Sequence, residues 1–178
     1  MRVQTIAGWH MKSVAVMALM CLLAAVPGDA TGLTPFAKRI LAAHNAERTL
    51  LKLPRLAWSD DLAADAAVWA NELAKTGKFQ HSPKAGRKDQ GENLWIGSAG
   101  AYMPEEMVEA WADEQQYFHD GVFPDVATAG EGHVVGHYTQ IIWKDTTQVG
   151  CAIANGNGRD ILVCRYSPAG NLIGERPY

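Results

Sequence analysis

A carboxylate on an apolar helix face is the first feature of this sequence that could do chemistry. The stretch after Pro104 repeats apolar residues at helical spacing, at Met107, Val108, Trp111 and Phe118. Glu114 lies three residues after Trp111 and four before Phe118, so it falls on the same face. Burying an unpaired charge is costly, so either this face reaches solvent or Glu114 has polar partners in a cleft. The helix pattern leaves both alternatives open.

No familiar catalytic motif accompanies this carboxylate. The sequence contains no HExxH metalloprotease motif, no GxSxG nucleophile motif and no phosphate-binding loop. Ser82 directly follows His81, but neighbouring side chains on a strand point to opposite faces. The adjacency therefore does not predict a Ser–His dyad.

Other polar residues have simpler expected roles. We expect His44 to be structural and hydrogen-bonded to another segment, and Glu47 and Arg48 to form a solvated helix face. His119 and His133 lie in a long loop and are expected to be solvated. They would extend a metal site only if that loop folded over it.

Two cysteines, Cys151 and Cys164, are expected to form a disulfide across a β-hairpin. Residues 148–154 and 160–166 alternate or run apolar, and the Asn157-Gly158 pair between them is typical of a type I′ turn. Counting outward from that turn places Cys151 opposite Cys164 at a non-hydrogen-bonded position, where antiparallel strands lie closest. Two free buried thiols are the less favoured alternative.

The N-terminal 30 residues have the pattern of a cleaved signal peptide. A positive start precedes an uncharged apolar run, Val14–Val26, which is shorter than the roughly 20 residues of a spanning helix. Gly28 and Ala30 then supply a small-x-small cleavage site near Ala30. The alternatives are a membrane anchor and, at Cys21, a lipoprotein site, which the bulky Met20 before it disfavours. We expect a secreted or periplasmic protein with no membrane span after cleavage.

The composition bounds the rest of the chain. The 178 residues are 48% hydrophobic and 20% charged, which indicates one globular domain over residues 31–178. The net charge of −3 and the lack of a basic run exclude nucleic acid as an expected partner.

Helices and strands alternate in a way that predicts an α+β domain. Thr34-Pro35 begins a helix that runs to about Leu51, and a second helix lies between a Ser59 cap and Gly77, with Trp69 in its apolar stripe. Short strands are expected at 79–82 and 93–96, and a long loop at 119–135. Periodicity does not decide between helix and strand for 137–143.

Several segments resemble the CAP superfamily, which includes the plant pathogenesis-related class-1 proteins and the insect venom antigen-5 proteins. The resemblance covers about residues 38–178 and is carried by the segments HNAER at 44, LAWS at 56, QHS at 80, GENL at 91, GHYTQIIW at 136 and CRYSPAGN at 164. It implies a three-layer α-β-α sandwich with a central antiparallel sheet.

The resemblance also implies a cleft that holds two histidines and two glutamates. The matching residues are His81, Glu92, Glu114 and His137, and this favours polar partners for Glu114. The two histidines would hold a divalent cation, such as zinc, weakly, because a catalytic zinc site normally has about three protein ligands. The glutamates would complete the shell or orient the histidines. The alternative is a structural polar network that binds metal only adventitiously.

Two functions from different classes follow. The first is an extracellular binding module for a lipid, a sterol or a protein, by analogy with the family. The second is a metal-dependent hydrolase or protease in which Glu92 or Glu114 acts as the general base. The few protein ligands for the metal favour the binding module over the enzyme.

Two departures from the family limit what can be carried over. Residues 126–135 lack the extra cysteines of the plant relatives, so we expect a more mobile loop there. The cysteine-rich extension of the animal venom and sperm members does not follow the domain, so we do not expect ion-channel blocking.

Overall fold

The computed structural model describes residues 32–87, 89–128 and 132–178, with the side chains of residues 132 and 133 excepted. The predicted signal peptide and the side chain of His133 therefore lie outside the described residues. Within the described ranges, no helix combines the length and the apolar character needed to cross a membrane.

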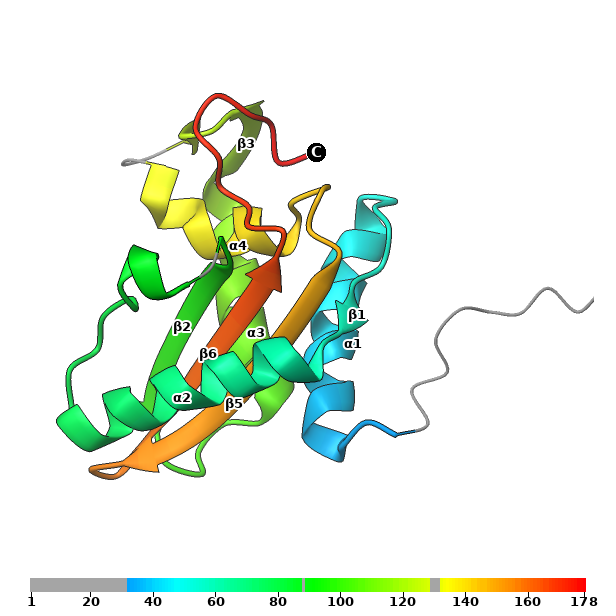
Figure 1. Cartoon of the computed structure of the whole chain (residues 1–178). Coiled ribbons are helices and arrows are strands. Elements are labelled where there is room, and N and C mark those ends of the chain that lie inside the picture. Colours follow the sequence, from blue (N-terminus) through cyan, green and yellow to red (C-terminus); the bar gives the residue numbers. More distant parts are fainter. Residues whose placement is uncertain (1–31, 88, 129–131) are drawn as a thin grey trace, which may run out of the picture.

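A four-stranded sheet forms the centre of the domain (Figure 1). Its strands, in spatial order, are β1 (Ala57–Trp58), β5 (Gln148–Gly156), β6 (Arg159–Ser167) and β2 (Gly91–Ser98). The pairs β5–β6 and β6–β2 are antiparallel, as expected. The short β1 pairs with β5 in parallel, so the sheet is mixed at that edge.

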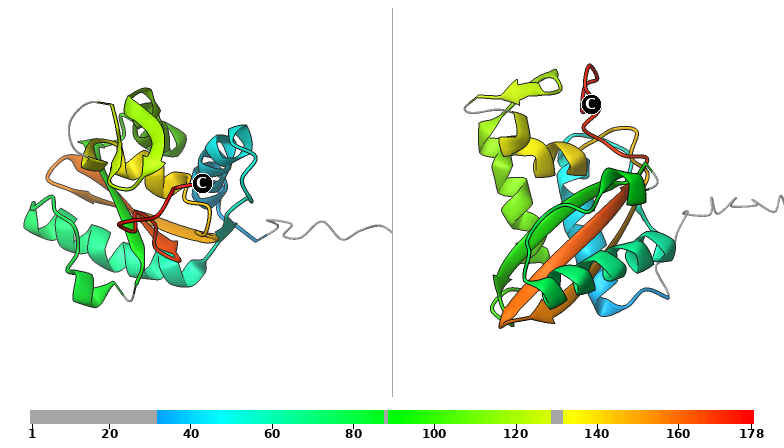
Figure 2. Two further views of the ribbon diagram at one scale, coloured as in Figure 1. Left: turned by 90° about the horizontal axis from the view of Figure 1, so that it is seen from above. Right: turned by 60° about the vertical axis from the view of Figure 1, so that its left-hand side comes forward.

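Helices cover both faces of this sheet and complete the expected three layers. Figure 1 shows α2 (Asp60–Thr76) in front of the sheet, with α1 (Pro35–Leu50) and α3 (Pro104–Ala112) behind it. The right-hand view of Figure 2 separates these layers. The short helix α4 (Gly136–Ile141) packs with α1 and α3 in the same core.

Alternation along the strands divides the interior into two cores. On β6, Ile161 and Val163 pack in the core under α2, whereas Leu162 and Tyr166 pack in the core under α1 and α3. The α2 layer lies very close to β5. A Cβ added to Gly150 would lie 2.3 Å from the backbone of α2, so only glycine fits there.

The predicted caps and the hairpin are confirmed. The Thr34 hydroxyl accepts a hydrogen bond from the amide of Ala37, and Gly77 ends α2 with a φ of 69°. Asn157 and Gly158 both have positive φ, and Cys151 pairs with Cys164 at a Cα separation of 4.1 Å. The disulfide between them is present.

Three local predictions differ from the structure, and one question that the sequence left open is answered. Residues 79–82 form no strand, because no neighbouring segment pairs with them. The expected long loop contains a hairpin of β3 (Phe118–Val122) and β4 (Asp125–Ala127), followed by a 3-10 turn, Gly132–Val135. The helix after Pro104 ends at Ala112 and continues as a 3-10 turn, Asp113–Tyr117, so Phe118 lies in β3 instead. Residues 137–143, for which periodicity did not decide between helix and strand, are mostly helical.

Arg48 does not lie on the solvated helix face that its position predicts. Its side chain is fully buried and donates to the carbonyls of Pro54, Ile141, Trp143 and Thr146 at 2.7–3.0 Å. These carbonyls lie in the segment after α1 and at or just after the end of α4, and their hydrogen bonds explain why a cation is accepted in the core. Burial lowers the pKa of Arg48 to about 10, so it stays protonated.

Candidate functional site: two histidine–glutamate pairs

Glu114 binds both the side chain and the backbone of the segment that begins α4. One carboxylate oxygen lies 2.6 Å from Nδ1 of His137, and the other accepts the amides of His137 and Tyr138 at 3.0 Å each. The 3-10 turn after α3 directs this side chain toward the first turn of α4. Of the two alternatives for Glu114, polar partners is therefore the correct one.

The second pair, His81 and Glu92, is centred on a more deeply buried carboxylate. Oε1 of Glu92 lies 2.7 Å from Nδ1 of His81 and accepts the amide of Ser82 at 2.9 Å. Oε2 accepts the Ser82 hydroxyl at 2.7 Å and lies 3.0 Å from Nη2 of Arg165. The side chain of Glu92 is 0% exposed, whereas that of His81 is 55% exposed.

Electrostatics keep Glu92 ionised in this position. Burial opposes the charge, but the hydrogen bonds from His81 and Ser82 and the charge of Arg165 outweigh it. Together they hold the pKa of Glu92 below its usual range. An ionised carboxylate is a strong acceptor for the Nδ1 proton of His81.

Ser82 and His81 do not form a Ser–His dyad, but the argument from opposite faces of a strand is wrong. The two residues do not lie on a strand, and both turn toward the same carboxylate of Glu92. The Ser82 hydroxyl donates to Glu92 and accepts from Arg165 at 3.0 Å. A hydroxyl held in this way serves to fix Glu92.

Strand β2 connects the two pairs through consecutive residues. Glu92 faces the α2 layer, while the next residue, Asn93, faces the other layer and donates its amide to the His137 carbonyl at 3.1 Å. β2 is the edge strand of the sheet. The structure thus links all four expected residues to one end of β2.

A buried network supports the His137 side of the site. The Asn93 amide also donates to the hydroxyl of Tyr166 at 3.1 Å, and that hydroxyl lies 2.8 Å from Nε2 of His44. Nδ1 of His44 donates to the carbonyl of Ile40 at 2.8 Å, so Nε2 is the acceptor. Burial lowers the pKa of His44 to about 4, which keeps it neutral. His44 therefore has the structural role that the sequence predicts.

Both site histidines have the same arrangement of ring nitrogens. Nδ1 donates to a glutamate, so in the neutral ring Nε2 carries the lone pair. A carboxylate behind Nδ1 is the usual support of a metal-binding imidazole. The glutamates are turned toward the histidines, so they fit the orienting role and not that of direct ligands. Within the described residues, no three His, Cys, Asp or Glu side chains group as a metal site.

Sequence reasoning missed the residues that hold this site in place. Asn93, Ser82 and Arg165 adjoin expected residues or motifs in the chain, and that proximity was the available signal. Trp111 was assigned to the core, and it also stacks on the His137 ring, with 5.8 Å between centroids and 17° between planes.

Comparison with known proteins agrees with this architecture. Residues 41–166 match the sequence model of the cysteine-rich secretory protein family. The chain belongs to this family. Pathogenesis-related protein 1A of Nicotiana tabacum is 39% identical over 139 residues, which are 78% of each chain. The family identity agrees with the export that the N-terminal sequence predicts.

Solved structures of the family share the fold of this domain. The structure of BmVAL-1 is similar with a TM-score of 0.68 and 30% identity, over 83% of this chain and 84% of that one. The structure of NaASP2 with Zn²⁺ is similar with a TM-score of 0.69 and 25% identity, over 83% of this chain and 87% of that one. The CAP resemblance and its α-β-α fold are therefore confirmed.

Proposed function

We propose that this protein is a secreted binding module whose cleft presents the imidazoles of His81 and His137 to one weakly held divalent cation, such as Zn²⁺. The observation that carries the proposal is the shared arrangement of the two rings. In each ring a glutamate accepts the hydrogen bond from Nδ1–H, so the lone pair that could bind a cation is on Nε2. NaASP2, a related protein, has been solved with Zn²⁺.

The donor set fits a labile site. Two imidazoles are fewer ligands than the roughly three of a catalytic zinc site, so water or a ligand would fill the remaining positions. A bound cation would supply a charged point to which an oxygen of a ligand can attach. The chain's own contribution is to orient both rings, through Glu92 and Glu114, before the cation arrives.

The geometry favours binding over hydrolysis. A general base needs a carboxylate lone pair directed at a water molecule. Both oxygens of Glu92 and both oxygens of Glu114 already accept hydrogen bonds from neighbouring groups. Neither glutamate is thus arranged as the base that a hydrolase or protease would need. A lipid, a sterol or a protein remains the proposed ligand class.

Zinc calorimetry on metal-free protein, produced through its export route, tests the proposal. We expect binding at micromolar concentrations that weakens at least tenfold in His81→Ala and in His137→Ala. His119→Ala is the matched control, because the side chain of His119 is also partly exposed but lies in β3, outside the two pairs. Undiminished binding in both cleft variants, or no saturable heat in the wild type, would overturn the cation site.

A further inference from the structure

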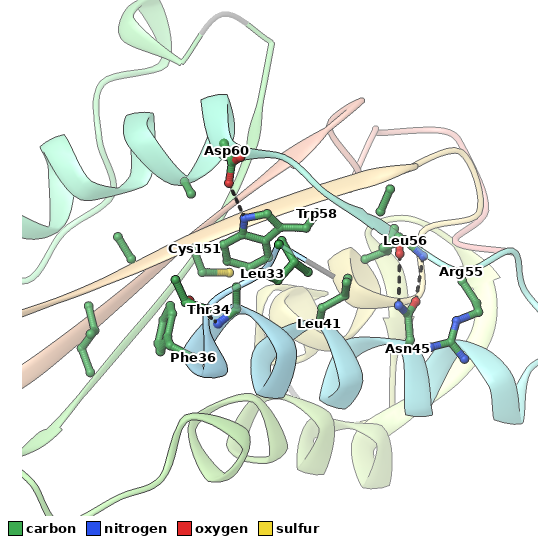
Figure 3. Close-up of a pocket in the computed structure, with 16 residues that line it drawn as sticks. Leu33, Thr34, Phe36, Leu41, Asn45, Arg55, Leu56, Trp58, Asp60 and Cys151 are labelled. Carbon is green, nitrogen blue, oxygen red and sulfur yellow. Dashed lines mark hydrogen bonds between the residues drawn. The ribbon is translucent and has the colours of Figure 1, made fainter. Parts of the chain in front are cut away.

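A cavity lies apart from the histidine–glutamate pairs, at the opposite edge of the sheet. It has a volume of about 1210 Å³ and lies between α1, β1 and the edge of β5 (Figure 3). Its apolar lining includes Leu33, Phe36, Leu41, Trp58 and Ile153. The volume exceeds the roughly 300–1000 Å³ of most small-molecule pockets, so the cavity has room for a ligand larger than a typical small molecule.

One wall of this groove is the edge of strand β5, where the described part of the chain leaves outward backbone groups without a backbone partner. Ser59 donates its amide to the carbonyl of Val149, so the odd-numbered residues of β5 turn their backbone groups outward. After Ser59 the segment that includes β1 leaves the sheet and begins α2, so β1 does not extend along the rest of β5. Among the described residues, no segment hydrogen-bonds to the outward backbone groups of Cys151 and Ile153. Both residues line the groove.

Two charged residues, Asp60 and Arg55, line the rim of the groove, and they differ in whether the described residues supply a partner. The Asp60 carboxylate accepts the indole N–H of Trp58 at 3.0 Å and lies in the first turn of α2, where negative charge is favoured. Arg55 also lines the groove, and within the described part of the chain its exposed guanidinium makes no ion pair. The charge left to be matched by a ligand is therefore positive.

We propose that this groove binds an extended, largely apolar peptide segment of a partner protein that carries a carboxylate. The segment adds a strand to β5 by pairing with Cys151 and Ile153, lays alternate side chains on the apolar lining, and directs its carboxylate to Arg55. An acyl chain would use the apolar lining but not the backbone edge. The inference rests on the proposed role as a binding module and names the partner class for a second site.

The proline variant of Ile153 separates these ligands. The Ile153 amide points away from β6, so Ile153→Pro removes an outward donor without removing a β5–β6 hydrogen bond. The probe is the blocked peptide acetyl-Val-Thr-Val-Thr-Val-Asp-amide, titrated by calorimetry or fluorescence anisotropy. We expect saturable binding that weakens at least tenfold in Ile153→Pro and stays within twofold in Ile153→Val. Replacing the peptide's Asp by Lys, or Arg55→Gln in the protein, should weaken binding severalfold.

Amide hydrogen exchange in the unaltered protein gives a second measurement, which stands even if the proline variant fails to fold. Saturating peptide should slow exchange at Cys151 and Ile153 at least tenfold and leave the β6-paired amide of Ala152 unchanged. No protection at those two amides would overturn the proposal. So would protection already present in the full 178-residue chain without peptide but absent from residues 31–178, because the occupant would then be the chain's own upstream segment.

Two further arms distinguish the remaining outcomes. Dodecanoate that binds equally well to wild type and Ile153→Pro, with no binding of the peptide, would identify an acyl site and overturn the peptide proposal. His81→Ala and His137→Ala should bind the peptide as the wild type does. Failure of the cation site and failure of the peptide groove are thus separate results.

Discussion

The indole of Trp111 lies almost parallel to the imidazole of His137, at 17° and 5.8 Å between ring centroids, while its N–H donates to the Leu94 carbonyl at 3.1 Å. One face of the His137 ring is thus set by a side chain that is itself anchored to β2. Glu114 fixes the same ring through Nδ1. The ring is held from two directions before any ligand arrives.

Trp111→Phe should weaken zinc binding severalfold while the protein remains folded. Phenylalanine keeps an aromatic surface but loses the hydrogen bond to β2, so the His137 ring gains orientational freedom. Calorimetry measures the affinity, and near-ultraviolet circular dichroism checks the fold. Trp95→Phe is the matched control, since Trp95 contacts Tyr102 and not His137. Equal losses in both variants would contradict a specific role for Trp111.

Glu92→Gln should destabilise the domain by about 2–4 kcal/mol, because it leaves the buried Arg165 cation without its carboxylate. Urea unfolding followed by fluorescence measures the change. The exposed pair of Arg39 and Glu105 provides the comparison, and Glu105→Gln should leave the free energy of unfolding near the wild-type value. A Glu92→Gln variant as stable as wild type would mean that Arg165 finds another partner.

Stability should fall as the pH is lowered from about 6.5 to about 4, through His44. An unfolded histidine has a pKa of about 6.5 and the buried one a pKa of about 4, so the unfolded chain binds the extra proton in this window. The contribution is complete above the unfolded pKa and is lost as the pH falls, to a limit of about 3 kcal/mol.

The pH effect is measured by urea unfolding at several pH values in wild type and His44→Gln. The variant should show a smaller slope than the wild type between pH 6.5 and 4. Glu92, whose folded pKa is lowered, adds a loss only as the pH falls through the acid range below its unfolded pKa. Identical slopes in His44→Gln and wild type would exclude His44 as the source.

Arg48→Lys should cost about 2–4 kcal/mol although it conserves the charge. The guanidinium donates to carbonyls on the turns after α1 and α4, and a single ammonium cannot reach all of them, so buried carbonyls lose their donors. Thermal and urea unfolding measure the loss. Arg39→Lys serves as the control, because Arg39 is an exposed residue of α1, and it should change the free energy of unfolding little.

Removing the disulfide with the double variant Cys151→Ala, Cys164→Ala should lower stability by about 2–3 kcal/mol. The bridge closes a short segment, with a sequence separation of 13, and the type I′ turn already favours that closure. Chemical unfolding with and without reductant gives the value for wild type. The reductant should have no effect on the double variant, and any effect there would point to a cause other than this bridge.

Local signals predicted the parts of the fold that short-range chemistry determines. The hairpin register follows from Asn157-Gly158 alone, and the ends of α2 follow from Ser59 and Gly77. The fate of Arg48 could not be predicted, because the carbonyls it satisfies lie 93–98 residues away for four of its contacts. Partners that are so distant in the sequence produce no pattern in the residues around Arg48.

The sequence predicted the four histidine and glutamate residues of the candidate site, but it did not predict the residues that hold them in place. Helical spacing raised the question of Glu114, and the family motifs supplied His81, Glu92 and His137. The actual backbone at Glu114 is a 3-10 turn, which the helical pattern does not distinguish from a further α-helical turn. Arg165 lies in a continuous run of buried residues on β6, Ile161 to Tyr166, and the sequence gives no signal for its partner on β2.

The position of Glu92 and Asn93 on consecutive residues of an edge strand has a consequence for how the domain responds to a ligand. These neighbours reach into different cores, one beneath α2 and the other beneath α1 and α3. A cation bound by both His81 and His137 would cross-link residues that are attached to the two layers. Separation of β2 from the sheet would then require both imidazoles to release the cation. Binding of the cation should therefore raise the barrier to unfolding of the whole sandwich and not of one layer alone.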